Sequence, residues 1–305
     1  MNQILNKVSL GSRPGGRPPA AVEISPQGVL AAALPATGQK PVYAYVPLHD
    51  GVLLPGIGEP NIRKQEAITS AIRSALGQVS PRSHSVTLVL PDTVVRVFML
   101  DFDALPSKTD EVFSVLRFRL RKMVPFEIEH AGLSYQVLVQ TKTECKVLAA
   151  VIPGPILQEY EAAVRSAGYE PGAVLPSGLA ALSVLDSMEA VLIANLTPTA
   201  LTTSITNGQD LLLYRTLDLP EDPAQRLTEV QRGIAVAAAY FEDILLVRPQ
   251  NLKYAGEYDS QLFADWLDNP NLIVDELAPL SRTEAATTLN NSRIAGVIGA
   301  LAGAM

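Results

Sequence analysis

Residues 118–138 read FRLRKMVPFEIEHAGLSYQVL and change from a charged helix to a strand across a single proline. The helix is expected to begin after Ser107, whose hydroxyl can cap its first turn. Arginine and lysine side chains gather in its last turns, where positive charge complements the helix dipole. Pro125 stops the helix because it lacks an N–H and clashes with the preceding turn. The stretch GLSYQVLVQ (132–140) then favours a strand.

The part of the chain before this stretch shows an α/β pattern. Apolar and β-branched runs predict strands at 20–24, 29–34, 42–47, 85–90 and 94–101. Between the third and fourth of these runs, Ile68, Ile72 and Leu76 recur every four residues and form one apolar face of a helix. After the stretch, CKVLAAVIP (145–153) predicts a further strand, and a helix that ends at Gly168 follows.

The C-terminal part of the chain repeats this order. AVLIANL (190–196) and ALTTSIT (200–206) predict a second hairpin, and a long helix is expected at 224–243. Within that helix the run IAVAAA (234–239) indicates tight packing against a neighbour. A helix rich in Ala and Gly closes the chain. The sequence therefore predicts two similar halves, of which the first carries an insertion.

The composition restricts the classes of function. The 305 residues are 48% hydrophobic, which suits a folded chain of about two domains. The net charge of −7 argues against general nucleic-acid binding. The single cysteine, Cys145, excludes a disulfide scaffold, and His49, His84 and His130 lack the spacing of metal ligands. The apolar run IAGVIGALAGAM (294–305) is too short to cross a bilayer, so no direct membrane span is expected.

Three segments together resemble the PilM family of type IV pilus assembly. They are SVTLVLPDTVVRVFMLDFDALP (85–106), the stretch at 118–138, and KVLAAVIPGPILQEYEAAVRSAGYEP (146–171). The stretch at 118–138 is the most specific of the three, because the family shares its Pro-Phe pair and its ending Leu-x-Tyr-Gln-Val-Leu. The cytoplasmic domain of GspL from type II secretion is a sister of the same group.

The resemblance implies an α/β, actin-like fold: a duplicated, ribonuclease H-like body of two lobes with an inserted small α/β subdomain. The expected parts are a flexible N-terminal tail at 1–19, a first lobe at 20–102, an inserted subdomain at 103–172 and a second lobe at 173–305. The C-terminal helix is expected to return to the body. Many members of the family bind ATP between the two lobes.

The resemblance also marks where a nucleotide would bind. Two hairpins would direct backbone N–H groups at the phosphates, and an aspartate in each lobe would orient Mg²⁺. In the first hairpin the aspartate and glycine of the family are replaced by Glu23 and Ser25. Pro26 and Gln27 follow them in the turn.

The second hairpin departs from the family pattern in the same way. Asn195 and Thr197 stand where the family has its aspartate and glycine, and Pro198 and Thr199 come next. The glycine-rich turn that makes room for adenosine keeps Gly256 alone. Both halves of the expected nucleotide site have therefore lost the same two residues.

Each turn has gained a proline directly after the lost glycine, and proline has no N–H to donate to phosphate. A hydrogen bond to a charged group contributes about 1.5–3 kcal/mol, so one loss per turn removes about 3–6 kcal/mol. A micromolar site is worth about −8 kcal/mol. We therefore expect a degenerate site, with no cofactor and no enzymatic activity. The alternative is a working site, in which ATP and Mg²⁺ control closure of the lobes. A third hypothesis, an unrelated α/β enzyme, has little support because the sequence shows no catalytic constellation.

The partners are implied by the same resemblance. In the PilM family, the cytoplasmic N-terminal peptide of PilN, an inner-membrane protein, docks in a groove beside the inserted subdomain. Here the candidate groove comprises Arg117, Val124, Pro125 and Phe126, with burial of Phe126 in the core as the alternative. The expected partners are a PilN-like protein and, beyond it, pilus motor or platform proteins. They would hold this protein at the cytoplasmic side of the inner membrane. A type II secretion system is the alternative to a pilus assembly system. The segment VSLGSRP (8–14) resembles the start of PilN-like proteins, so it could occupy the groove of its own molecule or of a neighbouring one, which would be self-association; a disordered tail is the alternative.

Overall fold

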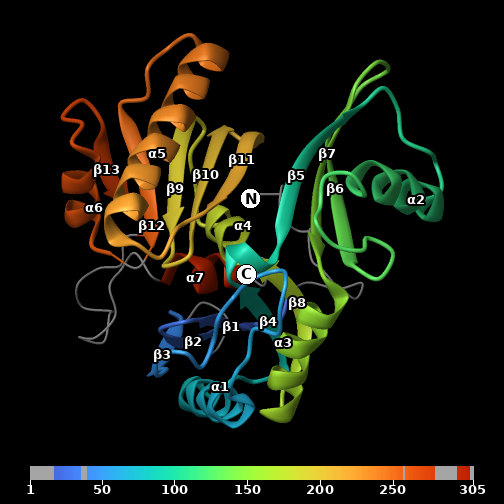
Figure 1. The fold of residues 1–305 in the computed structure, drawn as a ribbon, viewed down its shortest axis with the longest axis vertical. Coiled ribbons are helices and arrows are strands. Elements are labelled where there is room, and N and C mark those ends of the chain that lie inside the picture. The colour runs from blue at the N-terminus through green and yellow to red at the C-terminus, as the bar shows by residue number, and fades with distance from the viewer. Residues whose placement is uncertain (1–16, 36–39, 257, 279–293, 303–305) are drawn as a thin grey trace.

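The computed structural model describes residues 17–35, 40–256, 258–278 and 294–302. Two five-stranded sheets lie on either side of a central layer of helices, and a three-stranded sheet projects to one side (Figure 1). Of the tail expected at 1–19, residues 1–16 lie outside the described residues. Arg17 belongs to the folded body, where its guanidinium donates to the carbonyl of Gly299 at 3.1 Å.

The first sheet has the order β3-β2-β1-β4-β8. Its strands are β1 (Ala20–Ser25), β2 (Gly28–Ala33), β3 (Val42–Pro47), β4 (Ser85–Leu90) and β8 (Glu170–Pro176). The first three strands form an antiparallel meander, and β4 and β8 continue the sheet in parallel. Helix α1 (Gln65–Val79) packs on β2 and β3 and buries Ile68, Ile72 and Leu76, which confirms the face predicted from their spacing. Helix α3 (Gly154–Ser166) packs beside α1.

The second sheet repeats this arrangement with the order β11-β10-β9-β12-β13. Its strands are β9 (Ala190–Leu196), β10 (Ala200–Asn207), β11 (Asp210–Asp218), β12 (Asn251–Gly256) and β13 (Ile273–Glu276). Again three antiparallel strands are followed by two parallel ones. Helix α5 (Pro223–Leu245) covers β9 and β10, and α6 (Ser260–Leu267) packs on β13. The shared strand order confirms the duplication predicted from the sequence.

The third sheet, with the order β5-β7-β6, is antiparallel throughout. It consists of β5 (Arg96–Phe102), β6 (Gly132–Gln140) and β7 (Cys145–Ile152), and helix α2 (Thr109–Leu120) accompanies it. The buried side chains of α2 join the core of this sheet; they are Val112, Leu116 and Leu120. Ser107 is not the cap of α2: the capping position is Lys108, and no described side chain caps the helix.

The strand pairing gives this insertion boundaries that differ from the expected range of 103–172. Strand β5 pairs with β7 and so belongs to the insertion, whereas β8 pairs with β4 in the first lobe. The change of sheet occurs at a short 3-10 helix, η1 (Asp92–Val94), which redirects the chain between β4 and β5. The run at 85–101 is apolar on both sides of this turn, so the sequence alone does not mark the point where the chain leaves the first sheet.

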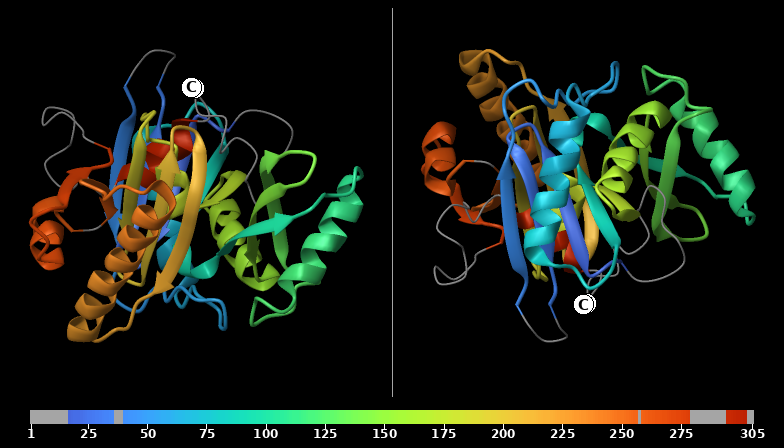
Figure 2. Two further views of the ribbon diagram at one scale, coloured as in Figure 1. Left: turned by 90° about the horizontal axis from the view of Figure 1, so that it is seen from above. Right: turned by 90° about the horizontal axis from the view of Figure 1, so that it is seen from below.

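Two short helices fill the layer between the large sheets (Figure 2). They are α4 (Ser177–Leu182) and α7 (Ala295–Ala302), and α7 also packs on β1, β2 and β4. A Cβ added to Gly299 would overlap the carbonyl oxygen of Ala180, so the backbones of α4 and α7 are in direct contact there. Among the described helices, none has both the length and the hydropathy needed to cross a membrane.

Candidate functional site

The turn between β1 and β2 holds the first set of predicted nucleotide-site residues. Ser25 pairs with Gly28, so Pro26 and Gln27 form a two-residue turn. The Ser25 hydroxyl donates to the Gly28 carbonyl at 3.1 Å, and the Gln27 carbonyl accepts from the Tyr45 hydroxyl at 2.7 Å. The Tyr45 ring covers the turn so closely that a Cβ on Gly28 would lie 2.5 Å from it. The turn is thus fastened to β3 by its own polar groups.

The turn between β9 and β10 holds the second set. Thr197 donates its backbone N–H to the Ala200 carbonyl at 2.9 Å, and the Ala200 N–H donates to the Thr197 hydroxyl at 3.1 Å. Pro198 contributes no donor. The Thr199 carbonyl accepts from the Leu219 N–H at 2.8 Å, which ties the turn to the end of β11. Of the three N–H groups in residues 197–200, two are used inside the turn.

Gly256 lies beside this second turn. It is the last residue of β12 and pairs with Leu196, the residue before Thr197. A Cβ at Gly256 would overlap the Leu196 carbonyl oxygen and come within 2.7 Å of the Tyr254 hydroxyl. Its backbone has a φ of +153°, which L side chains rarely adopt. The glycine is therefore required by the close approach of two strands.

Behind the turns, Glu23 and Asn195 join one hydrogen-bond network across the two lobes. The Ser177 hydroxyl, at the start of α4, donates to Glu23 Oε1 at 2.7 Å. The Asn195 amide donates to Asp92 Oδ2 at 3.1 Å and approaches the Ser177 hydroxyl oxygen at 3.4 Å. The predicted positions in the two hairpins are thus linked through Ser177 and Asp92, two residues that the sequence did not single out.

Asp92 is the centre of this network and is fully buried. Its Oδ1 accepts from the Gly178 backbone N–H at 2.8 Å, and its Oδ2 accepts from the Thr202 hydroxyl at 2.7 Å and from Asn195. Burial raises the pKa of Asp92, against the lowering effect of these three hydrogen bonds. Burial, with the neighbouring Asp92, also holds the pKa of Tyr214 well above 10. One signal in the sequence marks Asp92: an acidic residue two positions beyond a largely apolar strand.

The donor set at the lobe interface fits a Mg²⁺–nucleotide poorly. Mg²⁺ prefers carboxylates that remain open to the metal and its waters. Both oxygens of Asp92 are occupied by protein donors, and the second-lobe carboxylate of the family is the amide of Asn195. The Glu23 carboxylate lies against the backbone of α7, where a Cβ on Gly296 would be 2.6 Å from Oε2. The arrangement is chemically suited to joining the lobes.

The candidate partner groove lies in the loop between α2 and β6. Val124, Pro125 and Phe126 line a cavity of about 610 Å³ together with Arg121 and residues 127–129. Val124 and Phe126 are half-buried and also pack against the core of the insertion, so Phe126 does both things that the sequence allowed. Arg117 does not line this cavity; its guanidinium donates to the carbonyls of Ile128, Glu129 and Ala131 and holds the loop in place.

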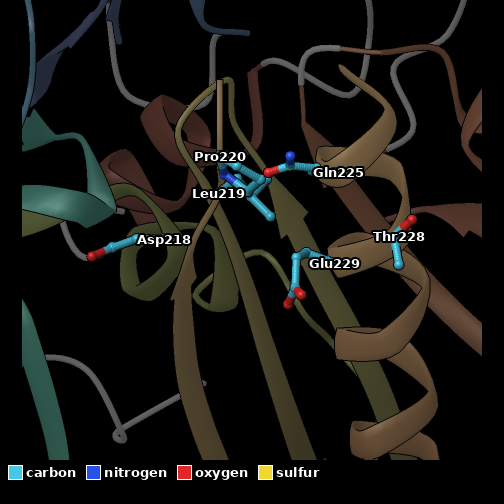
Figure 3. Close-up of a pocket in the computed structure, with 6 residues that line it drawn as sticks. All are labelled: Asp218, Leu219, Pro220, Gln225, Thr228 and Glu229. Atoms are coloured by element: carbon cyan, nitrogen blue, oxygen red, sulfur yellow. The ribbon is translucent and has the colours of Figure 1, made fainter. Parts of the chain in front are cut away.

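A second cavity, of about 570 Å³, lies between the end of β11 and the start of α5 (Figure 3). Leu219, Pro220, Gln225 and Glu229 are among its lining residues. The Asp218 carboxylate points away from α5 in Figure 3 and pairs with Arg96 at 2.6 Å, which connects β11 to the insertion. No feature of the sequence predicted this cavity.

The whole chain matches known structures, whereas no family model and no curated protein matches its sequence. A chain of a PilM–PilN type IV pilus biogenesis complex is 18% identical, with a TM-score of 0.75 over 94% of this chain and 98% of that one. A protein of unknown function with an actin-like ATPase fold, from Bacteroides thetaiotaomicron, is 10% identical, with a TM-score of 0.53 over 93% and 94%. The cytoplasmic domain of EpsL, an inner-membrane component of the type II secretion system of Vibrio cholerae, is 13% identical, with a TM-score of 0.49 over 92% of each chain. This chain therefore has the two-lobed actin-like fold, in an arrangement like that of the PilM–PilN complex chain.

Proposed function

We propose that this protein is a non-enzymatic, PilM-like scaffold of type IV pilus assembly that binds the cytoplasmic N-terminal peptide of a PilN-like inner-membrane protein. The single observation that carries this proposal is the buried network around Asp92, seen in a fold like that of a PilM–PilN complex chain. The network joins the lobes at the place where an actin-like protein would hold phosphate and metal. Lobes joined by buried hydrogen bonds suit a protein whose task is to present a surface to a partner.

Three features support the degenerate nucleotide site. Pro26 and Pro198 remove one phosphate donor from each turn. The second turn also uses the N–H groups of Thr197 and Ala200 internally, so two of its three remaining donors are engaged. Asn195 supplies an amide in place of a carboxylate, and this amide donates a hydrogen bond to Asp92. A site with these losses would hold ATP at millimolar concentration or weaker.

The insertion offers a place for an extended peptide. Strand β6 is at the edge of the three-stranded sheet, so its outer backbone groups can pair with an added strand. It begins at Gly132, directly after the loop whose Val124, Pro125 and Phe126 line the cavity. An added peptide strand would gain affinity from main-chain hydrogen bonds, and one apolar side chain in the cavity would set its register. Through this peptide the protein would sit at the cytoplasmic face of the inner membrane, where pilus motor or platform proteins could reach it.

Peptide binding is tested with a fluorescent synthetic peptide carrying the cytoplasmic N-terminal sequence of a PilN protein. Phe126→Ala should weaken binding about tenfold or more, because aromatic anchors in pockets dominate such interfaces. Pro125→Asp changes an exposed residue of the same cavity and guards against misfolding of the Phe126 variant. Met188→Asp, at an exposed apolar residue just before β9, is the matched control and should bind like wild type. Binding that is absent in the wild type, or indifferent to both cavity variants, contradicts the proposed groove.

The alternative function is an ATP-binding scaffold in which nucleotide closes the lobes. It is supported only by the hairpin frame itself, in which Glu23, Asn195 and Gly256 lie near the two turns. Thermal unfolding with Mg-ATP separates the two functions, since a ligand of the native state raises the midpoint. A clear rise at sub-millimolar Mg-ATP would establish the alternative.

A further inference from the structure

One helix presents an apolar stripe to solvent that the proposed function does not use. On α5, Val236, Tyr240 and Ile244 are spaced four residues apart and are 45%, 42% and 41% exposed. Ala235 and Ala239 are exposed on the same side. The alanine-rich run 234–239 is therefore only half used within the molecule: Ile234, Ala237 and Ala238 pack against the core of the second sheet, and Ala235, Val236 and Ala239 are exposed.

Two opposite charges bracket the stripe. Arg232 precedes Val236 by one turn, and Asp243 follows Ala239 by one turn, so these four residues share one face of the helix. Arg232 is 65% exposed and makes one long contact with Glu229, 3.4 Å between Arg232 Nη2 and Glu229 Oε2. Asp243 is exposed and forms no ion pair with any described residue. A cation at one end and an anion at the other make the face complementary to its own reversed copy.

We propose that α5 is a self-association surface, and that its occupant is α5 of a second copy of this chain in antiparallel orientation. A two-fold axis that runs perpendicular to the helices, at the level between Ala237 and Ala238, places each residue opposite its mirror position in the other helix. Arg232 then faces Asp243 of the second copy, and the reciprocal pair repeats this contact. A parallel arrangement would instead set Arg232 against Arg232 and is disfavoured by like-charge repulsion.

The same register matches large side chains with small ones. Val236 falls opposite Ala239 of the second copy, and Tyr240 falls opposite Ala235. Two helices approach to about 8 Å when small residues occupy the contact, and a large side chain on one then fills the space over an alanine on the other. The exposed Leu246 and Val247, just after the end of α5, extend the apolar area. A pair of single helices is a small interface, so this dimer is expected to be weak and to depend on concentration.

This inference does not depend on the nucleotide site or on the PilN-like peptide, because α5 lies on the outer face of the second lobe (Figure 1). Sedimentation velocity of the full chain at low salt, from micromolar to millimolar concentration, should show a monomer–dimer equilibrium. Arg232→Glu and Asp243→Arg should each weaken it about tenfold, since each replaces two attractive pairs by two repulsive ones. An equimolar mixture of these two variants should dimerise again, because each altered residue then faces a partner of opposite charge.

Arg215→Glu, an identical charge change at an exposed position on β11, is the control and should dimerise like wild type. Recovery in the mixture is specific to the antiparallel register, because a change in net charge or in folding would not be reversed by mixing. Three results would each overturn the inference: a wild-type monomer at all concentrations, an unchanged dimer in Arg232→Glu, or no dimer in the mixture.

Discussion

Replacing Asp92 with alanine should destabilise the protein in the absence of any nucleotide. In the proposed account this carboxylate is a structural acceptor that joins β4, α4 and the second sheet. If Asp92 were instead a metal ligand, its removal would affect binding of Mg-ATP and leave the unliganded protein almost unchanged. The stability of the unliganded variant therefore separates the two roles.

The magnitude follows from what each donor can do once the carboxylate is gone. The Thr202 hydroxyl can turn to Thr216 Oγ1 at 3.0 Å, and the Asn195 amide can use the Ser177 hydroxyl at 3.4 Å. The Gly178 N–H donates to Asp92 and, once the carboxylate is gone, is left buried without an acceptor, which costs about 1–3 kcal/mol. The empty space adds to this cost, and relief of the buried charge subtracts from it. We expect a net loss of about 2 kcal/mol, and about half of that for Asp92→Asn, which keeps one oxygen.

The assay is chemical denaturation of wild type, Asp92→Ala, Asp92→Asn and the control Asp50→Ala, each with and without Mg-ATP. Asp50 is an exposed acid in the first lobe, so its removal should change the free energy of unfolding by less than about 0.5 kcal/mol. The reasoning is refuted if Asp92→Ala is as stable as Asp50→Ala. It is refuted doubly if Mg-ATP then stabilises the wild type and fails to stabilise the Asp92 variant.

Three further predictions concern the same framework. Because burial raises the pKa of Asp92, the folded chain holds the Asp92 proton more tightly than the unfolded chain does. The stability of wild type relative to Asp92→Asn should therefore fall as the pH rises from about 4 toward neutrality. A difference in denaturation midpoints that stays constant with pH would contradict this. Gly299→Ala should lower the free energy of unfolding by about 2–4 kcal/mol, because the added Cβ would overlap the Ala180 carbonyl. Gly77→Ala in α1, where the space around the glycine is open, should raise it by about 1 kcal/mol. Equal effects of the two variants in thermal unfolding would refute the α4–α7 contact. Arg117→Ala should release the loop at 128–131 and weaken peptide binding, while the exposed Arg119→Ala should not; amide hydrogen exchange in the loop measures the first effect directly, and unchanged exchange would exclude the clamp.

The repeated fold could be predicted because its signals are local. Apolar runs and the four-residue spacing of Ile68, Ile72 and Leu76 define strands and helices without knowledge of their neighbours. The two hairpins repeat in the same order in both halves, and that repetition indicates the duplication. The start of the insertion could not be predicted, because Pro91, Asp92 and Thr93 mark a break between two strands but do not show that the second strand joins another sheet.

The candidate site was predictable only at its edges. Glu23, Asn195 and the two turn prolines follow from the resemblance, and the structure shows how each is placed. Asp92 and Ser177 lie 85 residues apart in the chain and are brought together because β4 pairs with β8, which sets Leu90 beside Pro176, so no spacing rule finds them. Arg117 shows the limit of the resemblance: it was expected in the partner groove, but it does not line the cavity there, and its guanidinium donates to backbone carbonyls.

The central claim is that this scaffold binds a PilN-like peptide without help from nucleotide. It is tested most directly by calorimetric titration of the synthetic PilN N-terminal peptide into nucleotide-free protein, and again in the presence of millimolar Mg-ATP. The account predicts saturable binding with the same affinity in both titrations. Absence of binding, or an affinity that changes several-fold with Mg-ATP, would contradict it.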